Sequence, residues 1–424
     1  MDQEALALQA IQKKLVGKRL NYAEIYAVMD QISHERLGDV LTTYFAASGY
    51  SKGFSDQEIY FLTKAMVETG EKLHFSGIVA DKHSIGGVPG TRTTLIVVPI
   101  VAAAGFKIPK SSSRAITTPG GTADDMEVLA GVEFDKEQIY KIVEKTKGCI
   151  VWGGSVNIAP ADDVIIRVEE PLVFESYDKI LVSIMAKKIA FGSTHVVIDL
   201  PYGEMVKVHN VKDAELLKDK FEKLAKKFDI KLRVLIHKTD EPAGRGIGPI
   251  LEVKESMLVL EQKPNRPFDL EERALNLAGS LLNLCLEDAS KTLREKVMKN
   301  HGGGHEWARS ILASGDALKK MQEIIKAQGG NEGVTSDKLR PGKYHYQVIA
   351  KKDGTVRKIN SKNATVIAKI LGAPDNHKAG IYLDKKIGEK VTKGHALYTL
   401  YSSNEYALKE AKDSTTNFPI LYYA

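Results

Sequence analysis

Cysteine and aromatic residues are scarce in this 424-residue sequence. Its two cysteines, Cys149 and Cys285, exclude a scaffold held by disulfides and fit a reducing compartment. Both stand in apolar sequence, so we expect them to be buried. Aromatic residues make up 7% of the chain, which argues against the stacking platforms that bind single-stranded nucleic acid.

Neither charge nor hydrophobicity is concentrated in one place. The net charge of +6 is mild for this length, and no block of Lys and Arg resembles a nucleic-acid-binding arm. The longest apolar run, residues 95–106, includes Pro99 and Gly105 and has about half the length of a membrane span. The chain begins with an acidic stretch, unlike a secretory signal. We therefore expect a soluble, cytoplasmic protein without nucleic-acid or membrane partners.

Hydrophobic periodicity divides the chain into three parts. Residues 1–72 have apolar positions three and four apart, which predicts a helical domain. Residues 73–156 and 186–335 alternate short β-prone segments with longer helical ones, which predicts an α/β domain with a mainly parallel sheet. Residues 336–424 have short β-prone segments and glycine turns, which indicates a C-terminal α+β domain. Strands are expected at residues 76–84, 106–113, 147–154, 195–203 and 231–238.

Three of the expected strands end in unusual sequences, at the edge where a parallel sheet holds its ligands. The first exit, residues 81–94, and the second, residues 111–122, each contain a Gly-Gly pair with flanking Ser, Thr and cationic residues. Glycine lets a backbone approach a ligand closely, and N–H groups at a helix start favour anions. The two loops therefore predict phosphate binding, with ordinary tight turns as the alternative. Their spacing matches neither a Walker loop nor a dinucleotide fingerprint.

Four short motifs follow one another in the chain: Lys82-His83-Ser84-x-Gly86-Gly87, Ser112-x-Arg114, Gly120-Gly121-Thr122 and Ser183-Ile184-Met185-Ala186-Lys187-Lys188. Together they resemble the type II nucleoside phosphorylases, which include thymidine and pyrimidine-nucleoside phosphorylases and the nucleotide-cleaving AMP phosphorylases. The resemblance covers nearly the whole chain. It implies a helical lobe that also takes in residues 157–185, an α/β phosphate-binding lobe, and a homodimer formed through the helical lobe.

The second loop indicates the branch of that family. Thymidine phosphorylases usually have Arg-Gly-Leu-Gly-His-Thr-Gly-Gly-Thr there, whereas residues 114–122 look like AMP phosphorylase. Thr117 and Thr118 add hydroxyl donors and Arg92 adds a cation, as a substrate 5′-phosphate would require. Lys207 looks like a lysine of AMP phosphorylases and adds another charge.

The resemblance implies phosphorolysis of a nucleoside 5′-monophosphate, with AMP favoured over CMP or UMP, to free base and ribose 1,5-bisphosphate. Inorganic phosphate is then a co-substrate and no cofactor is needed. No histidine spacing suggests a metal site. Two alternatives stay open: a thymidine or pyrimidine nucleoside phosphorylase that releases (deoxy)ribose 1-phosphate, and a non-catalytic nucleotide-binding homologue.

The resemblance also implies site residues. Glu175 stands where the family has its proton-donating Asp, which moves the carboxyl group by one methylene, and His83 is a second catalytic candidate. The attacking phosphate is expected at Lys82, Ser84, Thr94, Ser112 and Thr122. The nucleotide is expected at Gly87, Arg92, Ser113, Arg114, Ala115, Ile116, Thr117, Thr118, Arg167, Ser183, Lys187 and Lys207.

Structural roles are the alternative for several of these side chains. Glu175 fits a solvated acid at a helix start equally well. His83 and Arg114 are also suited to holding their loops in place. Lys207 is equally well explained as a solvated lysine.

Overall fold

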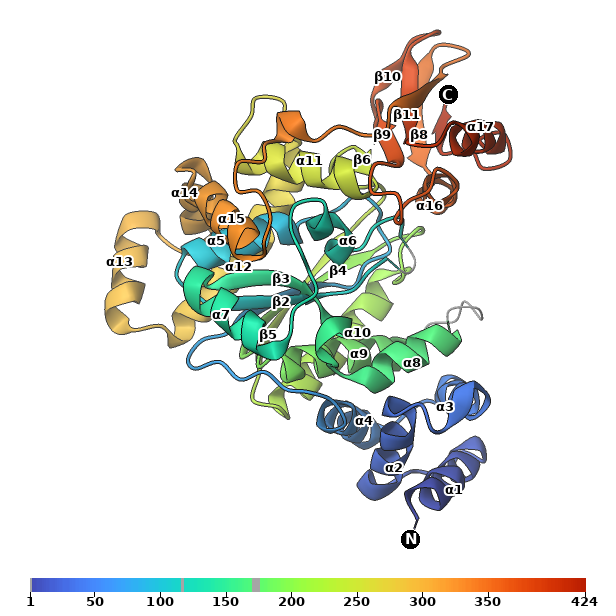
Figure 1. Cartoon of the computed structure of the whole chain (residues 1–424), viewed down its shortest axis with the longest axis vertical. Helices are drawn as coiled ribbons and strands as arrows, with labels where there is room; N and C mark the ends of the chain where they lie inside the picture. Colours follow the sequence, from blue (N-terminus) through green and yellow to red (C-terminus); the bar gives the residue numbers. More distant parts are fainter. Residues whose placement is uncertain (1, 116–117, 170–175) are drawn as a thin grey trace.

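The computed structural model describes residues 2–115, 118–169 and 176–424. In Figure 1 the N-terminal helices lie at one end of the long axis, a parallel sheet flanked by helices lies in the middle, and the C-terminal domain lies at the other end. This arrangement confirms the predicted α/β architecture with a helical N-terminal part and an α+β C-terminal part. Among the described residues, no helix is both long and apolar enough to cross a membrane.

Within the described ranges, five parallel strands form the central sheet. β1 pairs with β4 and β4 with β5, while β2 pairs with β3, and a parallel bridge between Val79 and Lys107 joins the two groups. The order is therefore β3-β2-β1-β4-β5, and the chain proceeds from β1 first to one side and then to the other. Ligands bind at the carboxyl edge where such a change of direction occurs. The strands are β1 (Ala80–Ser84), β2 (Ile108–Ser112), β3 (Gly148–Trp152), β4 (His195–Tyr202) and β5 (Lys231–Lys238).

Helices cover both faces of this sheet, so even the polar strands β1 and β2 are mostly buried. One face carries α5, whose residues from Thr94 to Ala102 are all buried, together with α11, α12 and α15. The other face carries α7, α9 and α10, and α10 buries Leu217, Phe221 and Leu224 as their spacing predicts. Both cysteines are buried, as expected. These helices are α5 (Thr94–Ala103), α7 (Lys136–Thr146), α9 (Tyr177–Ala190), α10 (Val211–Lys226), α11 (Pro249–Leu260), α12 (Phe268–Asp288) and α15 (Asp316–Ala327).

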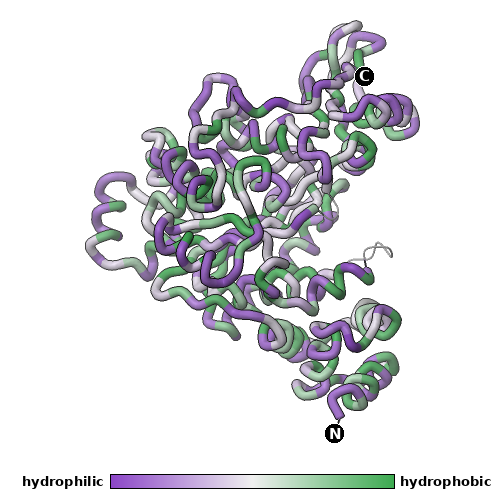
Figure 2. Tube along the Cα trace, in the orientation of Figure 1, coloured by the Kyte–Doolittle hydropathy of each residue, from purple (hydrophilic) through white to green (hydrophobic). Residues whose placement is uncertain are grey.

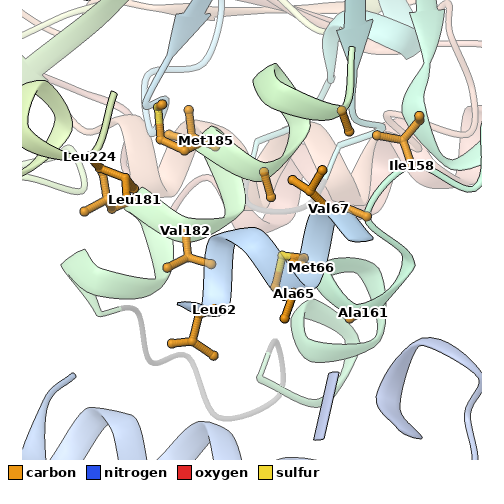
Figure 3. Close-up of a cluster of buried hydrophobic side chains, with 14 of the residues drawn as sticks. Leu62, Ala65, Met66, Val67, Ile158, Ala161, Leu181, Val182, Met185 and Leu224 are labelled. Atoms are coloured by element: carbon orange, nitrogen blue, oxygen red, sulfur yellow. The ribbon is translucent and has the colours of Figure 1, made fainter. Parts of the chain in front are cut away.

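The N-terminal helices pack against two helices from the middle of the chain. α2 and α3 contact α8, and α4 contacts α9. Figure 3 shows apolar side chains between them, among them Leu62 of α4 and Val182 of α9. The start of α2 is fixed by a capping box between Asn21 and Glu24. The remaining helices of this group are α1 (Gln3–Leu15), α2 (Tyr22–Ser33), α3 (Gly38–Lys52), α4 (Asp56–Glu68) and α8 (Pro160–Glu169).

The C-terminal domain contains two small antiparallel sheets, ordered β6-β9-β11-β7 and β10-β8-β12. β6 lies in the chain before α11, so the α/β part contributes one strand to the C-terminal sheet. The strands are β6 (Gly246–Ile247), β7 (Tyr344–Ile349), β8 (Gly354–Ile359), β9 (Gly380–Leu383), β10 (Lys390–Val391), β11 (Ala396–Ser402) and β12 (Leu421–Tyr423). The helices are α16 (Ser361–Ile370) and α17 (Glu405–Ser414).

Three further helices complete the α/β part: α6 (Thr122–Glu127), α13 (Lys291–His301) and α14 (Gly304–Ala313). α6 follows the second glycine loop. α13 lies at the edge of the molecule and is hydrophilic along most of its length (Figure 2), with Val297 as its buried residue.

Candidate active site

Side chains of β1 alternate between the two faces of the sheet. Ala80 belongs to the apolar core on the α5 face, so Lys82 and Ser84 point to that face as well. Asp81 lies on the opposite face, where it contacts α9. Ser84 pairs in register with Asp199 of β4. The carboxyl edge of the sheet therefore presents two different sets of groups, one on each face.

The ammonium group of Lys82 is the centre of the first set. Its Nζ donates to Ser84 Oγ at 2.6 Å and to Thr93 Oγ1 at 2.7 Å, and lies 3.4 Å from Thr94 Oγ1. Lys82 is 2% exposed, and burial lowers its pKa to about 8, with Asp199 acting in the opposite direction. Three predicted phosphate ligands thus lie together. A buried ammonium surrounded by hydroxyl groups suits a small oxyanion.

Asp199 of β4 contacts this cluster through Ser84. Ser84 Oγ donates to Asp199 Oδ2 at 2.7 Å, and His237 Nδ1 lies 3.4 Å from Asp199 Oδ1. Burial lowers the pKa of His237, with Asp199 opposing that shift. Arg273 of α12 donates to Thr239 Oγ1 at 3.0 Å, and its positive charge acts to lower the pKa of both Lys82 and His237. Acidic and basic groups therefore meet at the ends of β1, β4 and β5.

The opposite face of β1 carries the second set. Asp81 Oδ2 accepts from Lys188 Nζ at 2.7 Å and from Ser193 Oγ at 3.1 Å, and all three side chains are buried. Burial holds the pKa of His83 well below its usual range, and the positive charges of Lys188 and Lys110 act in the same direction. His83 is therefore a neutral imidazole at physiological pH, able to donate from one ring nitrogen and accept at the other.

The two predicted base-binding residues on α9 share one partner. Asp162 of α8 accepts from Ser183 Oγ and from Lys187 Nζ, each at 2.7 Å. Burial works to lower the pKa of Lys187, but Asp162 and Asp163 outweigh it and raise the pKa. Lys187 therefore keeps its charge, and both side chains lie on one face of α9, as their spacing predicts.

Arg167 does not join this pair. It lies five residues after Asp162 on α8, which turns it by about 140° around the helix axis. It is half-exposed and lies 3.4 Å from Glu35 Oε2 and 3.1 Å from Asp39 Oδ1. The structure therefore places it at the surface beside α2 and α3, apart from the other predicted base-binding residues.

The second glycine loop is held by contacts within itself. Asp124 Oδ2 accepts from the backbone N–H groups of Ala115 and Gly121, each at 2.7 Å. Thr118 Oγ1 donates to the carbonyl oxygen of Gly120 at 2.8 Å. The sequence predicts these N–H and hydroxyl groups as ligand donors, whereas here Asp124 occupies two of them.

Arg114 is held by neighbouring acids. Its guanidinium donates to both oxygens of Glu127, at 2.6 and 2.8 Å, and to Glu133 at 2.7 Å, and it stacks 4.9 Å from the ring centre of Trp152. This placement favours the alternative in which Arg114 ties the loop to its surroundings.

One group of side chains has metal-ligand chemistry. Among the described residues, Asp124, Glu127 and His377 bring ligand atoms within 4.8 Å of one another. Arg114 already contacts both carboxylates, so its charge balances theirs and the group suits an ion-pair network.

Arg92 differs from expectation. The sequence predicts a cation for a substrate phosphate, whereas the guanidinium is buried with Nε 2.6 Å from Asp125 and 2.5 Å from Glu252, and also contacts the carbonyl of Gly120. Burial raises the pKa of Asp125, as does the neighbouring Glu252. The charge of Arg92 is therefore balanced within the protein, and Arg92 links the first loop to α6 and α11. The surrounding sequence gives no sign of this, because Glu252 lies 160 positions away in the chain.

The remaining candidates lie along the same edge. Gly87 has φ of +87° and packs on Lys207, whose backbone nitrogen lies 3.1 Å from the position of an added Cβ. The Ser112 hydroxyl is buried and has no hydrogen-bond partner among the described residues, Ser113 is exposed, and Thr122 begins α6 half-buried. Three candidates lie outside the described residues: Ile116, Thr117 and Glu175.

Family models match three successive regions of the chain. The helical bundle domain of the glycosyl transferase family matches residues 8–70, its a/b domain matches residues 76–318, and the pyrimidine nucleoside phosphorylase C-terminal domain matches residues 355–418. The chain belongs to this phosphorylase family. It is an enzyme, a pentosyltransferase, and the predicted resemblance is confirmed.

Relatives of this phosphorylase carry two names. The AMP phosphorylase of Methanocaldococcus jannaschii is 44% identical over 405 residues, which cover 96% of this chain and 78% of that protein. A putative thymidine phosphorylase of Legionella pneumophila strain Paris is 43% identical over 408 residues, which cover 96% of this chain and 76% of that protein. The shared activity is therefore that of a nucleoside or nucleotide phosphorylase.

A solved structure of low sequence identity resembles this chain in fold alone. The crystal structure of anthranilate phosphoribosyltransferase from Thermus thermophilus is similar with a TM-score of 0.60, over 76% of this chain and 99% of that chain, at 18% identity.

Sequence reasoning missed several residues of the candidate site. Thr93 stands beside the predicted Thr94, and the neighbouring hydroxyls were the available signal. Asp199 lies near the carboxyl end of β4, and no sequence motif assigns it a role. His237 and Arg273 reach the site through strand pairing and helix packing, which no local motif records.

Proposed function

We propose that this phosphorylase cleaves a nucleoside 5′-monophosphate, with AMP favoured over CMP or UMP. Inorganic phosphate attacks C1′ of the ribose, a C–O bond forms there, and the bond from C1′ to the base nitrogen breaks with its electrons leaving on the base. The products are free base and ribose 1,5-bisphosphate. Phosphate itself is the nucleophile, so the reaction needs no cofactor.

The observation that carries this proposal is the cluster around Lys82. The Thr93 hydroxyl accepts a hydrogen bond from Lys82 Nζ, and the Thr94 hydroxyl lies 3.4 Å from the same nitrogen. Each hydroxyl can therefore donate its own proton to a ligand. The cluster stands at the carboxyl edge beside β1, where the direction of the connections changes. A small oxyanion bound there is held by a charge and by hydroxyl donors of fixed geometry, which both bind and orient it.

The base is proposed to bind at the opposite face of β1. Ser183, Lys187 and the neutral His83 offer donors, an acceptor and a positive charge. A leaving pyrimidine anion is stabilised by a cation, whereas a purine leaves best when a general acid protonates N7. Glu175, the sequence candidate for that acid, lies outside the described residues. Adenine is favoured because AMP phosphorylases are among the relatives.

The 5′-phosphate is proposed to bind where Lys207 meets the first glycine loop. The missing side chain at Gly87 lets Lys207 pack closely against this loop, and the lysine adds charge there. Arg92 is already paired with two acids and Arg114 with three, so neither is assigned to this phosphate.

A homodimer is proposed through the N-terminal helices. Leu15 and Val16 at the end of α1 and Val40 and Tyr44 on α3 are exposed apolar side chains, and α1 packs against α3. Such neighbouring apolar groups suit burial against a second copy.

The test is base release from AMP, CMP, UMP, adenosine, uridine and thymidine, each with and without inorganic phosphate. Phosphate-dependent release from the monophosphates supports the proposal. Release from uridine or thymidine alone identifies a pyrimidine nucleoside enzyme instead. Phosphate-dependent release from none of the six contradicts the proposed substrates.

Lys207→Met tests the 5′-phosphate assignment. Losing one charge-assisted contact with a phosphate raises KM for AMP by about 10- to 100-fold, and by much less for adenosine, which has no phosphate. Lys212→Met, at an exposed lysine in the first turn of α10, is the matched control and leaves both KM values unchanged. Equal effects of Lys207→Met on AMP and adenosine contradict the assignment.

A further inference from the structure

We infer that Asp162 is a positioning residue for the base, because its carboxylate holds Ser183 and Lys187 together as one unit that receives the leaving base. The inference rests on the proposed function, in which these two side chains face the base. It adds a residue that acts on the substrate only through the other two.

A single carboxylate oxygen joins the two base-binding candidates. Asp162 lies in the first turn of α8, and its Oδ2 accepts from Ser183 Oγ and from Lys187 Nζ at 2.7 Å each. The residue is 1% exposed, so water does not compete for these hydrogen bonds. Ser183 and Lys187 stand one turn apart on α9, and the shared oxygen fixes the distance between their polar atoms.

The shared oxygen also decides which groups remain for a ligand. A carboxylate can only accept, so the Ser183 hydroxyl gives its single proton to Asp162 and keeps a lone pair. Lys187 spends one of its three N–H donors in the same way. The unit therefore offers an acceptor beside charged donors. The polar edge of a nucleobase is complementary to that pair, because a ring nitrogen or carbonyl oxygen stands there next to an N–H group.

Two successive lysines of α9 connect α8 to the central sheet. Lys187 reaches Asp162 of α8, whereas Lys188 donates to Asp81 of β1 at 2.7 Å in a fully buried pair. β1 also carries Lys82, the centre of the oxyanion cluster. The unit is thus held in a defined position relative to that strand, as a base and a phosphate that react at the same ribose require.

Charged groups face Lys187 from two neighbouring elements and from its own helix. Burial acts to lower the pKa of Lys187, but Asp162 at 2.7 Å and Asp163 at 3.8 Å, both on α8, outweigh it. Burial lowers the pKa of Lys179 on α9 and of His83 on β1, and the charge of Lys187 acts in the same direction. Lys187 therefore depends on the two acids for the charge that stabilises an anionic leaving base.

The second oxygen of Asp162 allows the charge to be removed without the geometry. Oδ1 is buried and has no hydrogen-bond partner among the described residues. In Asp162→Asn the amide nitrogen can stand at this position while the amide oxygen keeps the hydrogen bonds from Ser183 and Lys187. Asn therefore removes the negative charge and leaves the unit assembled.

The first experiment measures kcat/KM for the best nucleotide or nucleoside substrate from pH 6 to 10, at saturating phosphate so that the oxyanion cluster stays occupied. In Asp162→Asn the alkaline fall is expected about 1 to 3 pH units lower than in the unaltered enzyme, because Lys187 loses its proton more easily. KM for phosphate at pH 7 is expected to stay unchanged, since Asp162 acts on the base. An alkaline fall that does not move overturns the inference.

Asp163→Asn is the matched control. Asp163 is the next residue and lies 3.8 Å from the same ammonium group, but its side chain is half-exposed, so water screens its charge. This variant is expected to keep kcat/KM at pH 7 and to move the alkaline fall by less than Asp162→Asn does. An equal shift in the two variants contradicts a specific role of Asp162.

Asp162→Glu tests the positioning itself and replaces Asp162→Asn if that variant does not fold. Glu keeps the negative charge but moves the carboxylate by one methylene, so kcat/KM at pH 7 falls by about 10- to 100-fold while the alkaline fall stays in place. Unchanged kcat/KM in Asp162→Glu overturns the inference. The proposed function fails in a different way, because then the unaltered enzyme itself shows no phosphate-dependent base release.

Discussion

Lys82 shows how burial tunes a single charge in this phosphorylase. The pKa of Lys82 is lowered to about 8: burial is the largest cause, the charges of Arg273, Arg92 and Lys188 act in the same direction, and Asp199 opposes them. The ammonium form therefore exists at neutral pH but is lost at mildly alkaline pH. A bound anion stabilises the charged form and raises this pKa again.

We predict that kcat/KM for phosphate falls as pH rises through about 8, because the free enzyme then loses the charge that attracts the anion. The fall approaches tenfold for each pH unit above 8 if neutral Lys82 does not bind phosphate. The pH profile of initial rates at low phosphate, from pH 6 to 10, measures it. Lys82→Arg keeps its charge across this range and should lose the alkaline fall, whatever its absolute rate. A profile of the unaltered enzyme that stays flat to pH 9.5 contradicts the prediction.

At the residue scale, sequence predicts the groups that local motifs carry and misses those that pairing brings in. Lys82, Ser84 and Thr94 belong to one strand–loop–helix segment, so their composition alone indicates an anion site. Asp199 lies 115 residues from Ser84 and reaches it because β4 pairs with β1. Arg92 was expected to face substrate, because nothing near it in the sequence indicates the two acids that hold it.

At the element scale, Gly121, which directly precedes α6, is a closely packed position of the candidate site. A Cβ at Gly121 lies 2.5 Å from the carbonyl oxygen of Ser113 and 2.6 Å from the carbonyl carbon of Arg114. These are backbone atoms, which cannot rotate away as a side chain does. The two passes of the chain are therefore in contact, and the N–H groups of the loop meet Asp124.

We predict that Gly121→Ala displaces this turn and lowers the free energy of unfolding by about 1 to 3 kcal/mol, the usual cost of overpacking. KM for phosphate should also rise, because Thr122 moves with the turn. Denaturant unfolding and steady-state kinetics measure the two effects. Gly153→Ala is the matched control, since its Cβ meets neighbours only at 3.8 Å. Equal stability of the two variants contradicts this account.

The elements themselves follow from sequence more closely than the site does. All five central strands fall within the predicted segments, because each segment is a short β-prone stretch between longer helical patterns. β6, which is two residues long, has no periodicity to detect. It forms because it pairs with β9 of the C-terminal domain, a contact that local pattern does not encode.

At the scale of the whole molecule, Glu255 controls how the C-terminal domain is attached. Its carboxylate accepts from the backbone N–H groups of Arg245 and Gly246, at 2.9 Å each. Arg245 in turn donates to the carbonyl of Asp384 at 3.0 Å and contacts Glu389. Burial raises the pKa of Glu255 to about 7, so a proton on this side chain favours the folded state.

We predict that this carboxyl group makes the protein less stable as pH rises from about 4.5 to 7. In that interval the unfolded state has released the proton and the folded state still holds it, so the stabilisation present below pH 4.5 is lost by pH 7. The full effect is at most about 3 kcal/mol. Denaturant unfolding of the wild type and of Glu255→Gln, compared at pH 5 and pH 8, isolates it.

Glu255→Gln cannot titrate, so the difference in unfolding free energy between the two proteins should shift toward the variant at pH 8. Glu241→Gln, a partly buried acid near the same junction, controls for the loss of a carboxylate and should show no comparable shift. A difference between wild type and Glu255→Gln that does not change with pH contradicts the role of Glu255.

Side chains along β1 alternate between the two faces of the sheet, and this alternation sets a frame that any redesign of the strand has to keep. A residue inserted into or deleted from this strand exchanges the side chains of its two faces, so Lys82 would turn toward α9 and His83 toward α5. A substitution in this strand changes the side chain on one face, whereas a change in its length displaces the groups on both faces at once. Residues 85–92 and 113–121, which follow the strands, lie outside this frame. Exchanging residues 85–92, where Gly87 packs on Lys207, with the corresponding loop of a related phosphorylase is therefore expected to alter the response to a substrate 5′-phosphate while the alternation of β1 is kept.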